Sequence, residues 1–146
     1  MKKDAKGFTL VELLVVISII AILSIIGLVS YTNFLKTSRD NKRLADLKFI
    51  QSALEEYHSD NLAYPFTVTP GSPLLNGSKT YMTKVPNDPT GTTEYSYAPL
   101  GTGCAAATPQ NCSSYCLYAA LEGTNIPASD AACTPTSPRN FGITRP

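Results

Sequence analysis

Residue types that carry out catalysis are scarce in this sequence. His58 is the only histidine, and it falls beside Glu55, Glu56 and Asp60 on the side of an amphipathic helical pattern that we expect to face solvent. The chain also lacks a nucleophile motif, a glycine-rich phosphate loop and a pair of acids at a recognisable site. We therefore predict that the protein is not an enzyme and needs no cofactor.

The net charge is close to zero, and the sequence has no metal-binding pattern. Twelve basic and eleven acidic residues give a net charge of +1, which provides no basic footprint for nucleic acid. The cysteines lack the paired Cys-x-x-Cys spacing of a zinc ribbon, so no metal site is expected. The length of 146 residues allows one domain.

Charge is almost missing from one long stretch near the amino terminus. Between Phe8 and Val29 the only ionisable side chain is Glu12. About 20 apolar residues, each rising about 1.5 Å along a helix, match a hydrocarbon core about 30 Å thick. The preceding lysines form a short positive leader, which the positive-inside rule keeps in the cytoplasm: Lys2, Lys3 and Lys6. The pattern predicts a single-pass membrane helix whose following residues face outward.

The apolar stretch also lacks the cleavage site of an ordinary secretory signal. Its small residues Ala21, Ser24 and Gly27 do not have the Ala-x-Ala spacing, so the helix is expected to stay as an anchor. Gly27 lowers helix stability by about 1 kcal/mol relative to alanine. Two interpretations of Gly27 stay open: a place where the helix bends, and a small residue that lets neighbouring helices approach.

Glu12 is the one acid in the apolar stretch. An ionisable side chain in such a span is a candidate functional residue that needs a partner. The alternative is that Glu12 lies close enough to the leader lysines to stay at the membrane interface.

The order Lys6-Gly7-Phe8-Thr9-Leu10-Val11-Glu12 before the apolar run resembles the class III signal of type IV prepilins and of type II secretion pseudopilins. The resemblance implies that a prepilin peptidase cuts after Gly7, which removes residues 1–7, and then methylates the new amino terminus at Phe8. It also implies that Glu12 neutralises the terminal amine of a neighbouring subunit during assembly. Further partners implied are an assembly-platform membrane protein and minor pilins.

An amphipathic helix is predicted to continue the membrane helix of residues 8–30 through residues 31–62. Its apolar residues recur at spacings of three and four: Leu44, Leu47, Ile50, Leu54 and Tyr57. Pro65 predicts a helix end near Asp60 and Asn61, with Asn61 in the left-handed conformation. The charged residues between the two halves of the helix are expected to form a solvated collar: Lys36, Arg39, Asp40, Lys42, Arg43 and Asp46.

Residues 63–146 are predicted to form a small globular region. Residues 66–83 are expected to be a surface connection with a short helix or turn near Lys79–Met82. Residues 94–98 and 115–122 have the pattern of an antiparallel hairpin, and residues 140–144 of a third short strand. A sheet packed on the apolar helix face gives an α+β protein with the pilin fold in outline. Residues 46–65 and 81–91 also resemble major pseudopilins.

The resemblance has one gap, which concerns calcium. The acidic carboxy-terminal loop that binds calcium in some members is missing here, and Thr90 stands where an aromatic residue is usual. Asp88 and Asp130 are therefore predicted to be turn formers rather than calcium ligands.

Four cysteines follow the membrane helix: Cys104, Cys112, Cys116 and Cys133. An even number in an outward-facing, oxidising compartment favours two disulfide bonds, which help a domain with a small core. Three pairings are possible. We favour Cys104 with Cys112 and Cys116 with Cys133.

The sequence therefore predicts a structural subunit of a type IV pilus-like or type II secretion pseudopilus fibre. Such a subunit self-associates into a helical filament after processing. It is a cell membrane protein with an extracytoplasmic globular part before assembly, and part of a fibre at the cell surface or in the periplasm afterwards. The alternative is a monomeric, membrane-anchored extracytoplasmic binding domain, which needs neither cleavage at Gly7 nor Glu12.

Overall fold

The computed structural model describes residues 7–146, apart from the side chains of residues 26–30. The predicted leader, except for Gly7, and the side-chain interpretations of Gly27 lie outside the described residues. Contacts divide the chain into two units, residues 1–36 and 37–146. The division falls within the long helix α1, which spans Leu10–Asn61, so the prediction of one helix through residue 61 is confirmed.

The second unit is built on the carboxy-terminal half of α1. Leu47, Ile50 and Leu54 are at most 1% exposed, as expected from their spacing on one helix face. They share one core with Leu117 and Phe141 of the sheet. The predicted α+β class, with a long helix packed on small antiparallel sheets, is confirmed.

The larger sheet has three antiparallel strands in the order β3-β4-β5. The strands are β3 (Ser96–Leu100), β4 (Ser114–Ala119) and β5 (Phe141–Ile143). β3 pairs with β4 so that Pro99 lies opposite Tyr115; proline fits here because β3 is an edge strand. A short 3₁₀ helix, η1 (Pro109–Asn111), lies in the connection between them. The predicted hairpin and third strand are confirmed.

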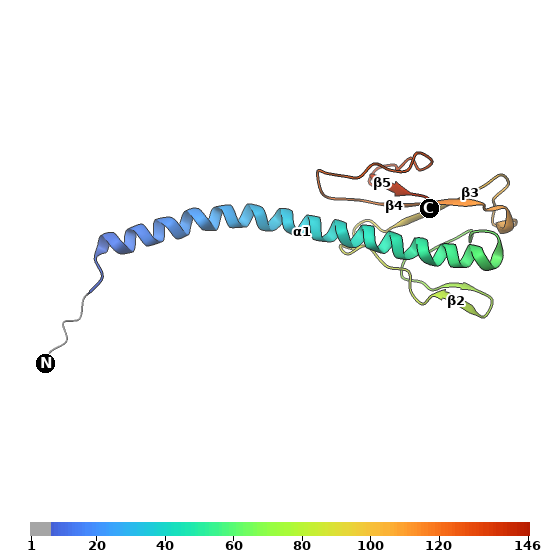
Figure 1. Ribbon diagram of the computed structural model, residues 1–146, viewed down its shortest axis with the longest axis horizontal. Coiled ribbons are helices and arrows are strands. Elements are labelled where there is room, and N and C mark those ends of the chain that lie inside the picture. The colour runs from blue at the N-terminus through green and yellow to red at the C-terminus, as the bar shows by residue number, and fades with distance from the viewer. Residues whose placement is uncertain (1–6) are drawn as a thin grey trace. The chain divides into compact units, whose positions relative to one another are not determined.

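A second, two-stranded sheet was not predicted. β1 (Leu74–Asn76) and β2 (Lys79–Met82) form an antiparallel hairpin where we expected a surface connection with a helix or turn near Lys79–Met82. Gly77, at a φ of 58°, supplies the positive φ that a two-residue connection needs at its first central position. In Figure 1 this hairpin and the three-stranded sheet lie on opposite sides of the second half of α1.

The end of α1 corrects another expectation. Leu62, not Asn61, adopts the left-handed conformation, with a φ of 57°, and its amide donates to His58 O over 2.8 Å. Asn61 stays helical because its side chain is used there: Nδ2 donates to Tyr57 O at 2.8 Å and to Tyr81 Oη at 3.0 Å. The left-handed position is therefore the residue after Asn61.

Candidate functional site

The first candidate site is the junction before α1. Gly7, Phe8 and Thr9 precede the helix without regular secondary structure, and Phe8 is 88% exposed. A methyl group built on Gly7 would meet no atom within 4 Å. The peptide bond between Gly7 and Phe8 is therefore accessible on the side that the structure describes.

Thr9 and Glu12 together cap the first turn of α1. The Thr9 amide and the Thr9 hydroxyl both donate to Glu12 Oε2 over 2.8 Å, and the Glu12 amide donates to Thr9 Oγ1 over 3.2 Å. This is a capping box, in which an N-cap threonine and a glutamate three residues later satisfy each other's backbone amides. Sequence reasoning missed it, although Thr-x-x-Glu before an apolar run is its signature.

The capping box uses only one oxygen of the Glu12 carboxylate. Glu12 Oε1 has no hydrogen-bond donor among the described residues, and the side chain is exposed. A carboxylate can accept several hydrogen bonds. Glu12 can thus hold the helix start and still accept a donor from another molecule.

The helix that follows exposes its apolar side chains. From Leu10 to Ile25 the large hydrophobic residues are 49–79% exposed. The two serines in this stretch are compatible with apolar surroundings, because Ser18 Oγ donates to Leu14 O over 2.8 Å and Ser24 Oγ to Ile20 O over 2.7 Å. Across the described residues, no helix combines the length and the apolar character required to cross a membrane.

A comparison with protein-family models identifies a known motif at the amino-terminal end of the chain. The family described as "Prokaryotic N-terminal methylation motif" matches residues 2–28. The chain carries an N-terminal methylation motif. Type II secretion system core protein G of Dickeya chrysanthemi is 28% identical over 102 residues, which cover 62% of this chain and 67% of that protein. The resemblance to prepilins and pseudopilins is confirmed, and no solved structure matches the chain.

In the second unit, the charges of α1 form a network instead of the solvated collar that we predicted. Arg43 is 2% exposed and Asp88 is 5% exposed. Arg43 Nε lies 2.6 Å from Asp88 Oδ2, and Arg43 Nη1 lies 2.7 Å from Asp40 Oδ1 and 2.8 Å from Glu122 Oε1. Arg39 Nε donates to Glu122 over 2.8 Å. Lys36 and Lys42 are exposed, as the collar prediction expects. The prediction is wrong for Arg39 and Arg43, because their partners Glu122 and Asp88 lie 45–83 positions away along the chain.

The network fixes two loops to the helix. The amides of Glu122 and Gly123 donate to the Asp40 carboxylate over 2.8–3.1 Å. Asp88 Oδ1 accepts the Thr90 amide over 2.8 Å, which is the turn-forming role expected for Asp88. Charged groups that are buried together in this way need one another, because removing one leaves an uncompensated charge.

The ion pairs lower the pKa values of two acids in the network, Glu122 and Asp88. The hydrogen bond from Arg39, helped by Arg43, lowers the pKa of Glu122 to about 2. Burial alone would raise the pKa of Asp88, but hydrogen bonds from Arg43 and Thr90 outweigh burial and hold that pKa below its usual value. Both acids are therefore ionised at neutral pH, where they compensate the guanidinium charges of Arg39 and Arg43.

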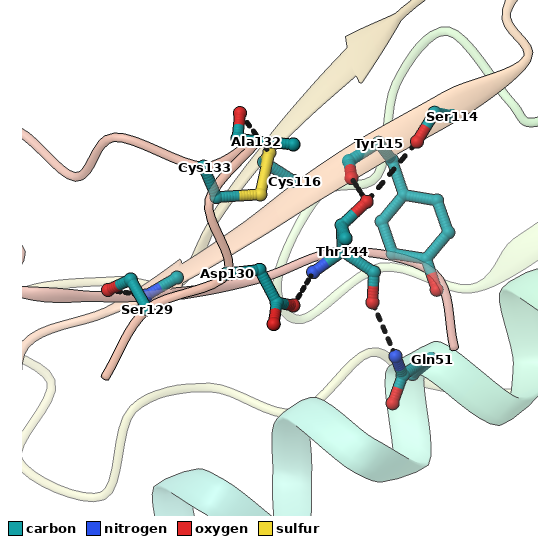
Figure 2. Close-up of a disulfide and its surroundings, with 10 residues drawn as sticks. Gln51, Ser114, Tyr115, Cys116, Ser129, Asp130, Ala132, Cys133 and Thr144 are labelled. Carbon is teal, nitrogen blue, oxygen red and sulfur yellow. Dashed lines mark hydrogen bonds between the residues drawn. A yellow bond between two sulfur atoms is a disulfide. The ribbon is translucent and has the colours of Figure 1, made fainter. Parts of the chain in front are cut away.

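Both disulfide bonds join elements of the second unit. Cys104 pairs with Cys112 and Cys116 with Cys133, which is the pairing that we favoured among three. Figure 2 shows Cys116, on β4, bonded to Cys133 in the segment before β5. The Thr144 amide donates to Asp130 Oδ2 at 2.6 Å and Gln51 Nε2, from α1, donates to Thr144 O at 2.5 Å (Figure 2).

The remaining predicted polar residues do not meet at one place. His58 is half-buried and stacks on Tyr64, with ring centroids 4.6 Å apart, so the expected solvated position is wrong. Tyr64 belongs to the core and is 1% exposed, so the imidazole of His58 that stacks on it lies against the core. Within residues that the structure describes, no three His, Cys, Asp or Glu side chains gather closely enough to hold a metal ion.

Proposed function

We propose that this chain is a structural subunit of a helical fibre, of the type IV pilus or of the type II secretion pseudopilus kind. A prepilin peptidase would cut after Gly7 and methylate Phe8, and the subunits would then assemble through the amino-terminal helix. The globular part would be extracytoplasmic, with the helix anchored in the cell membrane before assembly. An assembly platform and minor subunits would be the further partners.

The observation that carries this proposal is the methylation motif matched over residues 2–28, joined directly to a helix with exposed apolar side chains. A lone globular domain would leave these side chains in contact with water, which is unfavourable at about 25 cal/mol per Å² of apolar surface. Membrane lipid before assembly and neighbouring helices after assembly would both cover them. The similarity to a core protein of type II secretion supports the pseudopilus kind.

Intact-mass analysis of the protein taken from its native membrane tests the processing step. We expect a chain that begins at Phe8 and carries one added methyl group on its amino terminus. A chain that keeps Met1, or one that begins between Ala21 and Gly27, would contradict the proposal. The same cells should yield, after shearing, fibres that contain this chain.

A further inference from the structure

A small groove lies beside the end of α1, where three segments of the second unit meet. Its volume is about 210 Å³, and its lining includes Tyr57 and Asn61 of α1, Tyr64, Asn76 of β1, and Pro109 and Gln110 of η1. We name it the Asn76 groove. None of these side chains is charged at neutral pH. A charged ligand would find no counter-charge in this lining, so the groove favours a neutral one.

The walls of the groove are tied to one another. Asn61 Nδ2 donates to Tyr81 Oη over 3.0 Å, and Asn61 Oδ1 accepts a hydrogen bond from Asn76 Nδ2. The Tyr64 amide donates to Cys112 O over 2.8 Å, which holds the residue after η1 against the chain that follows α1. The groove is therefore formed before any ligand enters, so binding need not order it first.

Two carboxamides in the groove have hydrogen-bonding groups to spare. The Gln110 side chain is exposed and makes no hydrogen bond among the described residues. Asn76 Oδ1 also has no donor in this part of the chain, although Asn61 fixes Nδ2 of the same side chain. A carboxamide offers two N–H donors and one carbonyl acceptor. The groove can thus satisfy ligand groups that both donate and accept, such as hydroxyl and acetamido groups.

The rest of the lining supplies ring surface. Tyr57 is half-buried, Pro109 is exposed, and Tyr64 is the most buried of the three at 1% exposure. Tyrosine gives a large contact area at a low cost in conformational entropy. A sugar ring has the same two-sided character as this groove, with polar groups at its edge and C–H groups on its faces. Such C–H groups pack well on the electron-rich face of an aromatic ring.

We infer that the Asn76 groove binds one residue of a neutral saccharide. Asn76 and Gln110 hydrogen-bond to its hydroxyl or acetamido groups, and Tyr57 packs on its ring. The volume suits a single sugar ring, since sites for drug-sized ligands have roughly 300–1,000 Å³. The inference goes beyond the proposed function, which requires no ligand. That function places this part of the chain outside the membrane, where it can meet a glycan.

An NMR titration of the full chain tests the binding. The isotope-labelled protein is held in a phosphocholine detergent, which has no sugar headgroup to compete, and is titrated with chitotetraose, cellotetraose or tetra-alanine. We expect the side-chain amide signals of Asn76 and Gln110 to shift with a saccharide and not with the peptide. A larger response to chitotetraose assigns glycans with acetamido groups. A larger response to cellotetraose assigns glycans with hydroxyl groups alone.

One substitution and a matched control locate the binding. Gln110→Ala should weaken saccharide binding at least five-fold, followed by the signals of Asn76, because it removes the unbonded carboxamide. The Gln110 side chain is exposed, so the fold should be unaffected. Asn87→Ala removes an exposed carboxamide that does not line the groove, and this variant should bind as the unchanged chain does.

Three outcomes would overturn the inference. The first is the absence of shifts at Asn76 and Gln110 with either saccharide, and the second is a shift of equal size with tetra-alanine. The third is equal weakening of binding in Gln110→Ala and Asn87→Ala. None of these results bears on cleavage at Gly7 or on fibre formation, which intact mass and sheared fibres measure. The proposed function and the saccharide site can therefore fail separately.

Discussion

Leu62 is the residue at which local backbone preference and the fold disagree. Its φ of 57° places an L-residue in the left-handed region, which costs roughly 1–2 kcal/mol for residues other than glycine. The side chain returns little of that cost, since it is 82% exposed. The strain persists because the helix must end here for Tyr64, one of the least exposed core residues, to turn inward.

Replacing Leu62 by glycine should therefore stabilise the protein. Glycine removes the left-handed strain but adds freedom to the unfolded chain, worth about 0.4–1 kcal/mol, so we expect a net gain of about 0.5–1 kcal/mol. Urea unfolding of the full chain in detergent measures it. Leu62→Ala is the matched control, because alanine removes the exposed side chain and keeps the strain. A loss of stability in Leu62→Gly that Leu62→Ala does not share would contradict this account.

At the scale of elements, the Arg43 network joins α1 to the loops around Asp88 and Glu122. The pKa of Glu122 is lowered to about 2 from a usual value near 4.5. A carboxyl whose folded pKa is depressed contributes stability above its unfolded pKa and loses it as the pH falls through its folded pKa. The window for Glu122 thus runs from about pH 4.5 down to about pH 2.

Acid should loosen these loops, and one substitution should reveal the share of Glu122. We expect the urea midpoint of the full chain in detergent to fall between pH 5 and pH 2.5. The urea midpoint of the Glu122→Gln variant should be lower at pH 7, because the substitution leaves the charges of Arg39 and Arg43 less well compensated. As the pH falls, this midpoint should decrease less steeply than that of the unchanged protein. Parallel curves for the two proteins would mean that Glu122 does not carry the pH dependence.

The elements that the sequence predicts well are those defined by local pattern. The three- and four-residue spacing of Leu47, Ile50 and Leu54 finds the buried helix face, and alternating residues find β3 and β4. The β1–β2 hairpin was missed because its strands are only three and four residues long, too short for an alternating pattern. Its two-residue turn, Gly77-Ser78, was the available signal.

The candidate sites also differ in whether local sequence alone could have predicted them. The junction at Gly7 and Phe8 is a contiguous motif, so one sequence suffices to locate it. The capping of α1 by Thr9 and Glu12 is also local and could have been predicted. The Arg43 network could not, because which of several charged residues on a helix meet distant loops depends on the folded topology and not on nearby sequence.

At the scale of the whole molecule, both units expose large apolar side chains on their part of α1. Those from Leu10 to Ile25 in the first unit are 49–79% exposed, and Phe49 in the second unit is 60% exposed. Glu12 belongs to the first unit and has one carboxylate oxygen without a donor among the described residues. Packing of apolar helices excludes water, so a terminal amine and a carboxylate buried there would each need the other.

We expect Glu12→Leu to leave membrane insertion and cleavage at Gly7 intact, because leucine only extends the apolar stretch, and to abolish or strongly reduce fibres. The capping box makes a second variant necessary, since leucine also removes the cap. Glu12→Gln keeps an oxygen that can accept the Thr9 amide but removes the charge. If the charge pairs with the amine of a neighbouring subunit, both variants should lose at least ten-fold in sheared fibre. Normal fibres from Glu12→Gln, with loss only in Glu12→Leu, would mean that the cap alone explains this acid.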